Sequence, residues 1–159
     1  MRLKTRRVEI VGVTSNPDGR WTKQMARNLT DCEDGFLRSA NYLIVDRDTK
    51  FRPLRSYMDA MTATKIVLLP PRSPNLNANL ERYFRSMKSE CLDRMIFFGQ
   101  RSLEQALMHF AAHYHEERNH QGLGNKLIDP GNEVGQKVGE VQCRERLGGM
   151  LRYFYRYAA

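Results

Sequence analysis

Hydrophobic and polar positions follow two different periods along the first half of the chain. Val8–Thr14 (VEIVGVT) is β-branched and apolar and predicts a strand, which the turn-forming residues 15–19 (SNPDG) end. From Trp21, apolar residues recur at every fourth position, so a helix is expected from there to about Cys32. The chain is thus predicted to begin with a strand and an amphipathic helix.

Three shorter segments continue this alternation. A second strand is predicted at Tyr42–Val45, a short helix at Leu54–Met61, and a third strand at Lys65–Leu69. Strands that alternate with helices favour an α/β fold, in which helices cover the faces of a sheet.

The second half is predicted to be mainly helical. One helix starts after Pro74 and continues to about Phe98, and a second has Ser102 as its N-cap residue. The pattern then breaks, so we expect a core at residues 1–125 and a basic, aromatic tail at residues 126–159.

The tail ends in residues 146–157 (RLGGMLRYFYRY), where arginines and aromatic residues are interleaved. Arginines that bind phosphate beside aromatic rings that stack on bases predict nucleic-acid contact. Leu147, Leu151 and Phe154 also recur at helical spacing, which predicts an apolar stripe that docks on the core or on a second subunit. Both interpretations stay open at this point.

Composition and charge narrow the class of protein. The 159 residues include 26 Lys and Arg against 18 Asp and Glu, a formal net charge of +8, and the sequence pI is about 9.7. Such an excess favours a polyanionic partner, and nucleic acid is the commonest one. No stretch approaches the roughly 20 apolar residues of a membrane span, and the basic N-terminus lacks the apolar run of a signal peptide.

Cysteine and histidine spacings do not predict a zinc site. Three cysteines lie far apart, which indicates neither a disulfide scaffold nor a zinc cluster and favours a reduced, cytoplasmic setting. His109 and His113 are spaced as a helical ligand pair would be, but no third ligand is evident. We therefore expect surface or partly buried histidines.

Two carboxylates are candidates for chemistry. Asp46 follows the strand predicted at Tyr42–Val45, and Glu81 lies early in the helix predicted after Pro74. Sites in open α/β sheets gather at the carboxyl ends of strands, and the intervening chain is long enough for a helix and a strand. The two acids could therefore converge on Mg²⁺, which takes hard oxygen ligands and supports two-metal phosphoryl transfer.

Three motifs in order carry a resemblance to a known family. They are VDRDTKF at residues 45–51, PPRSPNLNANLERYFRSMKSE at residues 70–90, and YHEERNHQGL at residues 114–123. They resemble the second acidic motif, the third acidic motif and the following tract of DDE integrases and transposases, the group of retroviral integrases and of bacterial insertion-sequence enzymes. The likeness covers most of the chain, from about Leu3 to Leu123.

This resemblance implies a fold, a function and a set of site residues. The fold would be the RNase H-like integrase core, a mixed sheet flanked by helices. Asp46 and Glu81 would be catalytic acids and ligands of Mg²⁺ or Mn²⁺. The implied function is DNA integration or transposition by metal-dependent cleavage and strand transfer, with element ends and target DNA as partners. The protein would be cytoplasmic, on the nucleoid when bound to DNA, and a homo-oligomer is a further expectation.

The family's first acid has no counterpart here. It lies on the first strand of the family's sheet, whereas no Asp or Glu precedes Glu9 in this chain. We therefore expect the first strand to be missing, by truncation or through a miscalled start, and we expect catalysis to be impaired because two acids position the metal ions less well than three. The alternative is a non-catalytic DNA-binding or dimerising remnant.

Basic residues beside Glu81 complete the candidate site. Arg85 and Lys88 share its helical face, and together with Arg82 they are predicted to bind DNA. An ordinary i,i+4 ion pair between Glu81 and Arg85 is the alternative. Asp48 is expected to be structural, paired with a neighbouring basic side chain in a turn.

Overall fold

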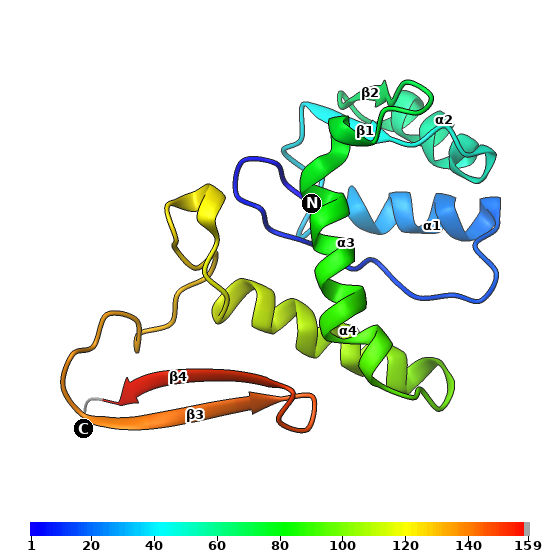
Figure 1. Ribbon diagram of the computed structural model, residues 1–159. Coiled ribbons are helices and arrows are strands. Elements are labelled where there is room, and N and C mark those ends of the chain that lie inside the picture. Colours follow the sequence, from blue (N-terminus) through cyan, green and yellow to red (C-terminus); the bar gives the residue numbers. More distant parts are fainter. Residues whose placement is uncertain (158–159) are drawn as a thin grey trace. The chain divides into compact units, whose positions relative to one another are not determined.

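A computed structural model of the protein describes residues 1–157, which form two compact units. Val11–Ala78 is called the strand–helix unit, and Met1–Ile10 together with Asn79–Ala159 is called the helix–hairpin unit. Figure 1 shows the elements of both units along the chain. Each unit is described by itself below.

A parallel strand pair forms the sheet of the strand–helix unit. β1 (Tyr42–Val45) pairs with β2 (Lys65–Leu68) in the register Tyr42↔Lys65 to Val45↔Leu68, and α2 (Arg52–Met61) connects them. A helical crossover of this kind is what parallel neighbours require. The carboxyl ends of both strands therefore lie at one edge. The predictions of these three elements are confirmed.

The first helix, α1 (Gly19–Leu29), has a clear start signal in the sequence. Asp18 is its N-cap, and the Asp18 carboxylate accepts a hydrogen bond from the Trp21 amide at 2.8 Å. α1 packs closely on α2, because a Cβ atom added to Gly19 would lie 2.9 Å from Cγ of Pro53. The predicted helix is confirmed, with both of its ends shifted toward the N-terminus.

The interior of this unit contains buried apolar side chains and buried hydroxyl groups that are hydrogen-bonded. Met58 of α2 is fully buried. The buried Thr22 hydroxyl donates to the Lys50 carbonyl at 2.9 Å, and the buried Thr64 hydroxyl donates to the Ala40 carbonyl at 2.8 Å. Buried polar groups need such partners, so these threonines fasten the connecting segments to the unit's core.

The helix–hairpin unit consists of two helices and an antiparallel hairpin (Figure 1). Its main elements are α3 (Ala78–Glu90), α4 (Gly99–Glu116), β3 (Glu140–Arg146) and β4 (Leu151–Tyr157). Short 3₁₀ turns complete the two units: η1 (Thr49–Phe51), η2 (Pro74–Asn77), η3 (Leu92–Arg94) and η4 (Gln121–Leu123).

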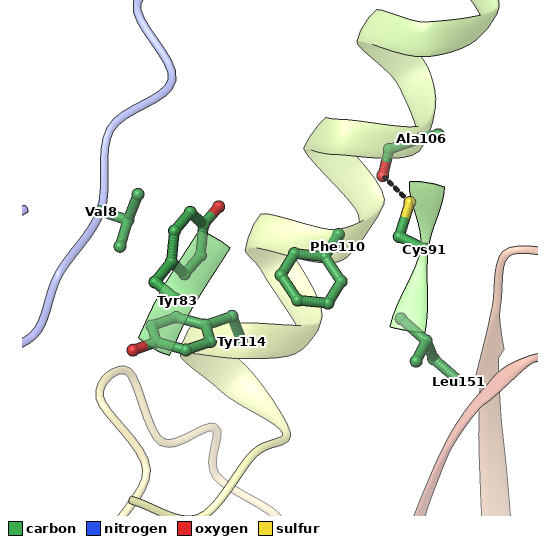
Figure 2. Close-up of a cluster of buried hydrophobic side chains, with 7 residues drawn as sticks. All are labelled: Val8, Tyr83, Cys91, Ala106, Phe110, Tyr114 and Leu151. Carbon is green, nitrogen blue, oxygen red and sulfur yellow. Dashed lines mark hydrogen bonds between the residues drawn. The ribbon is translucent and has the colours of Figure 1, made fainter. Parts of the chain in front are cut away.

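One hydrophobic cluster holds the helix–hairpin unit together (Figure 2). Its buried members are Val8, Tyr83, Cys91, Ala106, Phe110, Tyr114 and Leu151. The rings of Tyr83 and Tyr114 meet edge to face, with centroids 4.9 Å apart. The N-terminal segment, α3, α4 and β4 therefore share a single core.

The strand predicted at Val8–Thr14 was wrong. These residues form no strand within the described chain. The Val8 amide donates to Nε2 of His115 at 3.0 Å instead of to a neighbouring strand, and the Val8 side chain joins the hydrophobic cluster. An apolar, β-branched run becomes a strand only where another strand can pair with it.

The two long helices have different ends from those predicted. α3 ends at Glu90 rather than near Phe98. Ser102 is not an N-cap, because α4 already begins at Gly99 and the Ser102 hydroxyl donates to the Gly99 carbonyl at 3.1 Å. This local bond satisfies the serine inside the first turn, which the sequence pattern alone does not distinguish from a cap.

The tail is a β-hairpin, so the helical stripe predicted within residues 146–157 was wrong. Three consecutive residues with positive φ, Leu147, Gly148 and Gly149, make the turn between the strands. Leu151 is buried in the core, whereas Phe154 is 64% exposed.

The α/β class is confirmed as a mixed α/β structure, in which the described strands form two two-stranded sheets. None of the helices in the described part of the chain is long and apolar enough to cross a membrane.

Candidate functional site

Asp46 lies at the edge of the strand–helix unit where both parallel strands end. It directly follows the buried Val45 of β1, but its own side chain is exposed. Its Oδ1 accepts a hydrogen bond from the Arg47 amide at 2.6 Å, and Nε of Arg47 donates to the Leu69 carbonyl beyond β2 at 2.8 Å. The carboxylate thus faces solvent beside two strand ends, as expected for a site in an open α/β sheet.

Asp48 has the structural role that the sequence predicts. It caps η1 by accepting a hydrogen bond from the Lys50 amide at 3.0 Å, and its other oxygen lies 3.0 Å from Nζ of Lys50. The hydrogen bond from that amide is the main reason why the pKa of Asp48 is lowered. The carboxylates of both Asp46 and Asp48 accept a hydrogen bond from a nearby backbone amide, but among the described residues only Asp48 also forms an ion pair.

Glu81 lies in the first turn of α3, and its side chain is exposed. A carboxylate near a helix N-terminus is favoured by the helix dipole. The i,i+4 ion pair with Arg85 does not form among the described residues, since no nitrogen of Arg85 lies within ion-pair distance of Glu81. Glu81 is therefore an accessible carboxylate that has no ion pair with any of the residues 1–157.

The predicted DNA-binding residues occupy two neighbouring faces of α3. Arg85 and Lys88 are exposed and lie one and two turns after Glu81 on the same side of the helix. Arg82 is also exposed, but it points toward an adjacent cleft that it helps to line. The structure thus brings these four residues of the prediction onto one helix.

The two candidate acids belong to different units, Asp46 to the strand–helix unit and Glu81 to the helix–hairpin unit. Taken separately, each is an exposed carboxylate of the hard-oxygen type that Mg²⁺ prefers, so the donor chemistry fits a divalent ion. Among residues 1–157 there is no group of three or more His, Cys, Asp or Glu side chains arranged to hold a metal.

His113, His115 and His120 have structural partners, whereas His109 is exposed on α4. His113 Nδ1 lies 2.8 Å from Oε2 of the buried Glu117. His120 donates from Nε2 to the Tyr114 carbonyl at 2.8 Å. His115 accepts the Val8 amide, and its burial lowers its pKa. All three cysteines are free thiols.

Two further basic residues escaped the sequence interpretation. Arg6 and Arg118 line the same cleft as Arg82, although they are far from it in sequence. Arg118 lies inside the YHEERNHQGL tract, which was a usable signal. The sequence around Arg6 gave no such signal, because Arg6 reaches the cleft only through the packing of the N-terminal segment on the helices.

Comparison with known proteins found one family match. Residues 62–127 match the family model of the integrase core domain. The matched part is less than half of the chain; it contains Glu81, the basic residues of α3 and the tract after α4, whereas Asp46 lies outside it. No curated protein and no solved structure matches the chain. The predicted resemblance to an integrase or transposase catalytic core is thereby confirmed.

Proposed function

We propose that this integrase-core-like chain acts on DNA in integration or transposition, by metal-dependent cleavage and strand transfer, and that its full fold is RNase H-like. The observation that carries the proposal is the integrase core match at residues 62–127. Within it, Glu81 is an exposed carboxylate that forms no ion pair in the described part of the chain, and exposed basic side chains follow it on the same helix. Cationic side chains beside a carboxylate can stabilise the negative charge that develops on a phosphodiester during phosphoryl transfer.

Asp46 and Glu81 are the residues that would hold Mg²⁺ or Mn²⁺. Such an ion, when bound, activates the attacking oxygen and stabilises the leaving oxygen of the phosphodiester. The two carboxylates would supply hard oxygen ligands and the negative charge that the ion requires. Catalysis with these two acids alone is expected to be slow, since positioning is most of this chemistry.

The basic residues of α3 would hold the DNA. Arg85 and Lys88 extend from the helix on the side of Glu81, so they would bind phosphates on either side of the reacting one. Arg82 would bind a further phosphate on the adjacent face. A basic protein of this kind would work in the cytoplasm on the nucleoid, and oligomerisation would bring two DNA ends together.

The proposal is tested by the activity of the purified chain on a DNA duplex with Mg²⁺ or Mn²⁺. We expect slow nicking or joining that is abolished by Asp46→Asn and by Glu81→Gln, since each substitution removes a metal ligand. Asp59→Asn is the matched control, because Asp59 is an exposed carboxylate of α2 and its loss should leave the rate unchanged. Activity that survives both site substitutions would contradict the assigned roles.

A second function, DNA binding without catalysis, is favoured by one observation. All of the candidate DNA-binding residues lie in the helix–hairpin unit, so the interface needs no contribution from Asp46. Salt-dependent DNA binding without turnover would support this function.

A further inference from the structure

A basic cleft of about 470 Å³ opens in the helix–hairpin unit, away from the face that carries Glu81. It is bounded by the N-terminal segment, by α3 and by the residues that follow α4. Three arginines line it, Arg6, Arg82 and Arg118, and none of the described residues in its wall is Asp or Glu. A wall that combines guanidinium groups and side-chain amides without carboxylates is suited to an anion.

Two of these three guanidinium groups are available for a ligand. Arg118 is engaged by Glu90, with Nη1 2.9 and 2.8 Å from the two carboxylate oxygens. Arg6 and Arg82 have no ion pair within the part of the chain that the structure describes. The cleft therefore carries two positive charges that form no ion pair with the acidic side chains of residues 1–157.

The charges of the three arginines all affect the hydroxyl group of Tyr114. Burial raises the pKa of the Tyr114 hydroxyl, and the charges of Arg118, Arg6 and Arg82 each oppose that rise, so all three lie close to the same side chain. Tyr114 itself is held in the core cluster by its ring, as Figure 2 shows. The positive charges are thus gathered around a rigid aromatic wall.

Arg6 is held at the cleft by an unusual backbone conformation. Its φ is +61°, in the left-handed region that costs a non-glycine residue about 1 kcal/mol or more. The Arg6 amide donates to the Arg2 carbonyl at 2.8 Å, and the Arg2 amide donates to the Arg7 carbonyl at 2.8 Å. An ion pair of Arg7 with Asp129 at 2.7 Å fastens the same segment to the unit. These contacts hold the backbone of Arg6 at the edge of the cleft.

We propose that this cleft binds the phosphodiester backbone of a DNA strand, with Arg6 and Arg82 as the phosphate ligands. Nucleic acid is favoured over a free anion because Arg82 lies between the cleft and the exposed Arg85 and Lys88 of α3, so one strand can follow both surfaces. Asn119 and Gln121 offer amide groups to the sugar–phosphate backbone. The inference rests on the proposed function for the nature of its ligand, and it adds a second DNA-binding surface apart from the carboxylates.

The test measures binding of the full chain to a short labelled duplex over a series of KCl concentrations. Arg6→Gln/Arg82→Gln should make the plot of log affinity against log salt shallower by about 2, because each phosphate contact contributes about 1 to that slope. Arg101→Gln/Lys137→Gln removes the same charge from exposed positions of the same unit outside the cleft and should leave the slope close to that of the wild type. Arg6→Lys/Arg82→Lys should retain the slope, which separates lost charge from lost folding.

The outcomes distinguish this inference from the proposed function. One outcome is a slope that is unchanged in Arg6→Gln/Arg82→Gln but shallower in Arg85→Gln/Lys88→Gln. This result would overturn the proposal that the cleft binds DNA, and it would leave DNA binding by α3 in place. No duplex binding by the wild type at low salt would overturn both. Inorganic phosphate that binds the wild type, depends on Arg6 and Arg82 and does not compete with the duplex would show a small-anion site and overturn the choice of DNA.

Discussion

At the scale of single residues, Tyr83 buries a hydroxyl group that finds no hydrogen-bond partner among the described residues. Its ring is at the centre of the core cluster, and burial raises its pKa, with smaller contributions from Tyr114 and Cys91. A buried polar atom without a partner loses its hydration and regains nothing in return. The residue therefore contributes its ring to stability, while its hydroxyl opposes it.

Replacing Tyr83 with Phe should raise the free energy of unfolding by about 1 kcal/mol, because the ring stays and the unsatisfied hydroxyl is removed. Urea denaturation with an unchanged m-value would measure this. Tyr155→Phe is the control, since the Tyr155 hydroxyl donates to the exposed Gln142 at 3.1 Å and its loss should change stability by less than about 0.5 kcal/mol. A loss of stability in Tyr83→Phe would mean that the hydroxyl has a partner after all.

The difference between Asp46 and Asp48 also belongs to this scale. Sequence reasoning separated them correctly in one respect, because Asp48 is paired with Lys50 as expected. The catalytic role of Asp46 stays a prediction. Its exposure explains how a carboxylate can directly follow the buried Val45 without a large desolvation cost.

At the scale of elements, a buried carboxylate fastens the β3–β4 hairpin to α4. The Glu117 side chain is fully buried just after α4, and its Oε1 accepts from Nε of Arg146 at 2.8 Å. Arg144 approaches the same oxygen at 3.5 Å, and His113 binds the other at 2.8 Å. Burial alone would raise the pKa of Glu117, but the hydrogen bonds from Arg146 and His113 prevail and lower it.

Replacing Glu117 with Gln should destabilise the protein by about 2 kcal/mol, because it removes a fully buried carboxylate that accepts charge-assisted hydrogen bonds. Arg146 and Arg144 would each keep a second carboxylate partner, Glu116 at 2.7 Å and Glu133 at 3.1 Å. Thermal or urea unfolding would measure the loss. Glu145→Gln is the matched control, since Glu145 and Arg152 form an exposed pair at 3.0 Å on the same hairpin, worth less than about 1 kcal/mol. Equal effects of the two substitutions would show that the buried contact does not fasten the hairpin.

The same contact predicts a pH dependence. The pKa of Glu117 is lower in the folded protein than its ordinary value of 4.5, so below pH 4.5 the unfolded chain binds more protons than the folded one. Stability should therefore be lost as the pH falls from 4.5 through the folded pKa. This component should be absent from Glu117→Gln.

Elements were predictable where local signals and tertiary contacts agree. Tyr42–Val45 is a strand as its pattern indicates, because β2 pairs with it, whereas Val8–Thr14 has a similar composition and no paired strand. The helix predicted in the tail was wrong for a related reason. Its residues fit a helical stripe, but the positive φ values of Leu147, Gly148 and Gly149 reverse the chain into a hairpin. A sequence pattern does not specify which partner a segment will meet.

At the scale of the whole molecule, a net charge of +8 predicted a polyanionic partner before any site was evident. The basic residues of α3 were predictable from their spacing to Glu81. The cleft was not, since its arginines come from positions 6, 82 and 118 and meet only through packing. The net charge can thus be read from the sequence, whereas the position of a basic surface depends on how the chain folds.

The central claim concerns two carboxylates that belong to different units, Asp46 and Glu81. If they hold the same ion, removing either one disrupts the site, and removing both adds little more. A double-mutant cycle measures this coupling directly.

The most direct measurement is therefore the affinity of the full chain for Mn²⁺ in the presence of duplex DNA, by titration calorimetry, for the wild type, Asp46→Asn, Glu81→Gln and the double variant. The account predicts that each single substitution weakens Mn²⁺ binding by at least about tenfold and that the double variant is scarcely weaker than either. Full additivity of the two effects, or Mn²⁺ affinity unchanged by both substitutions, would contradict it.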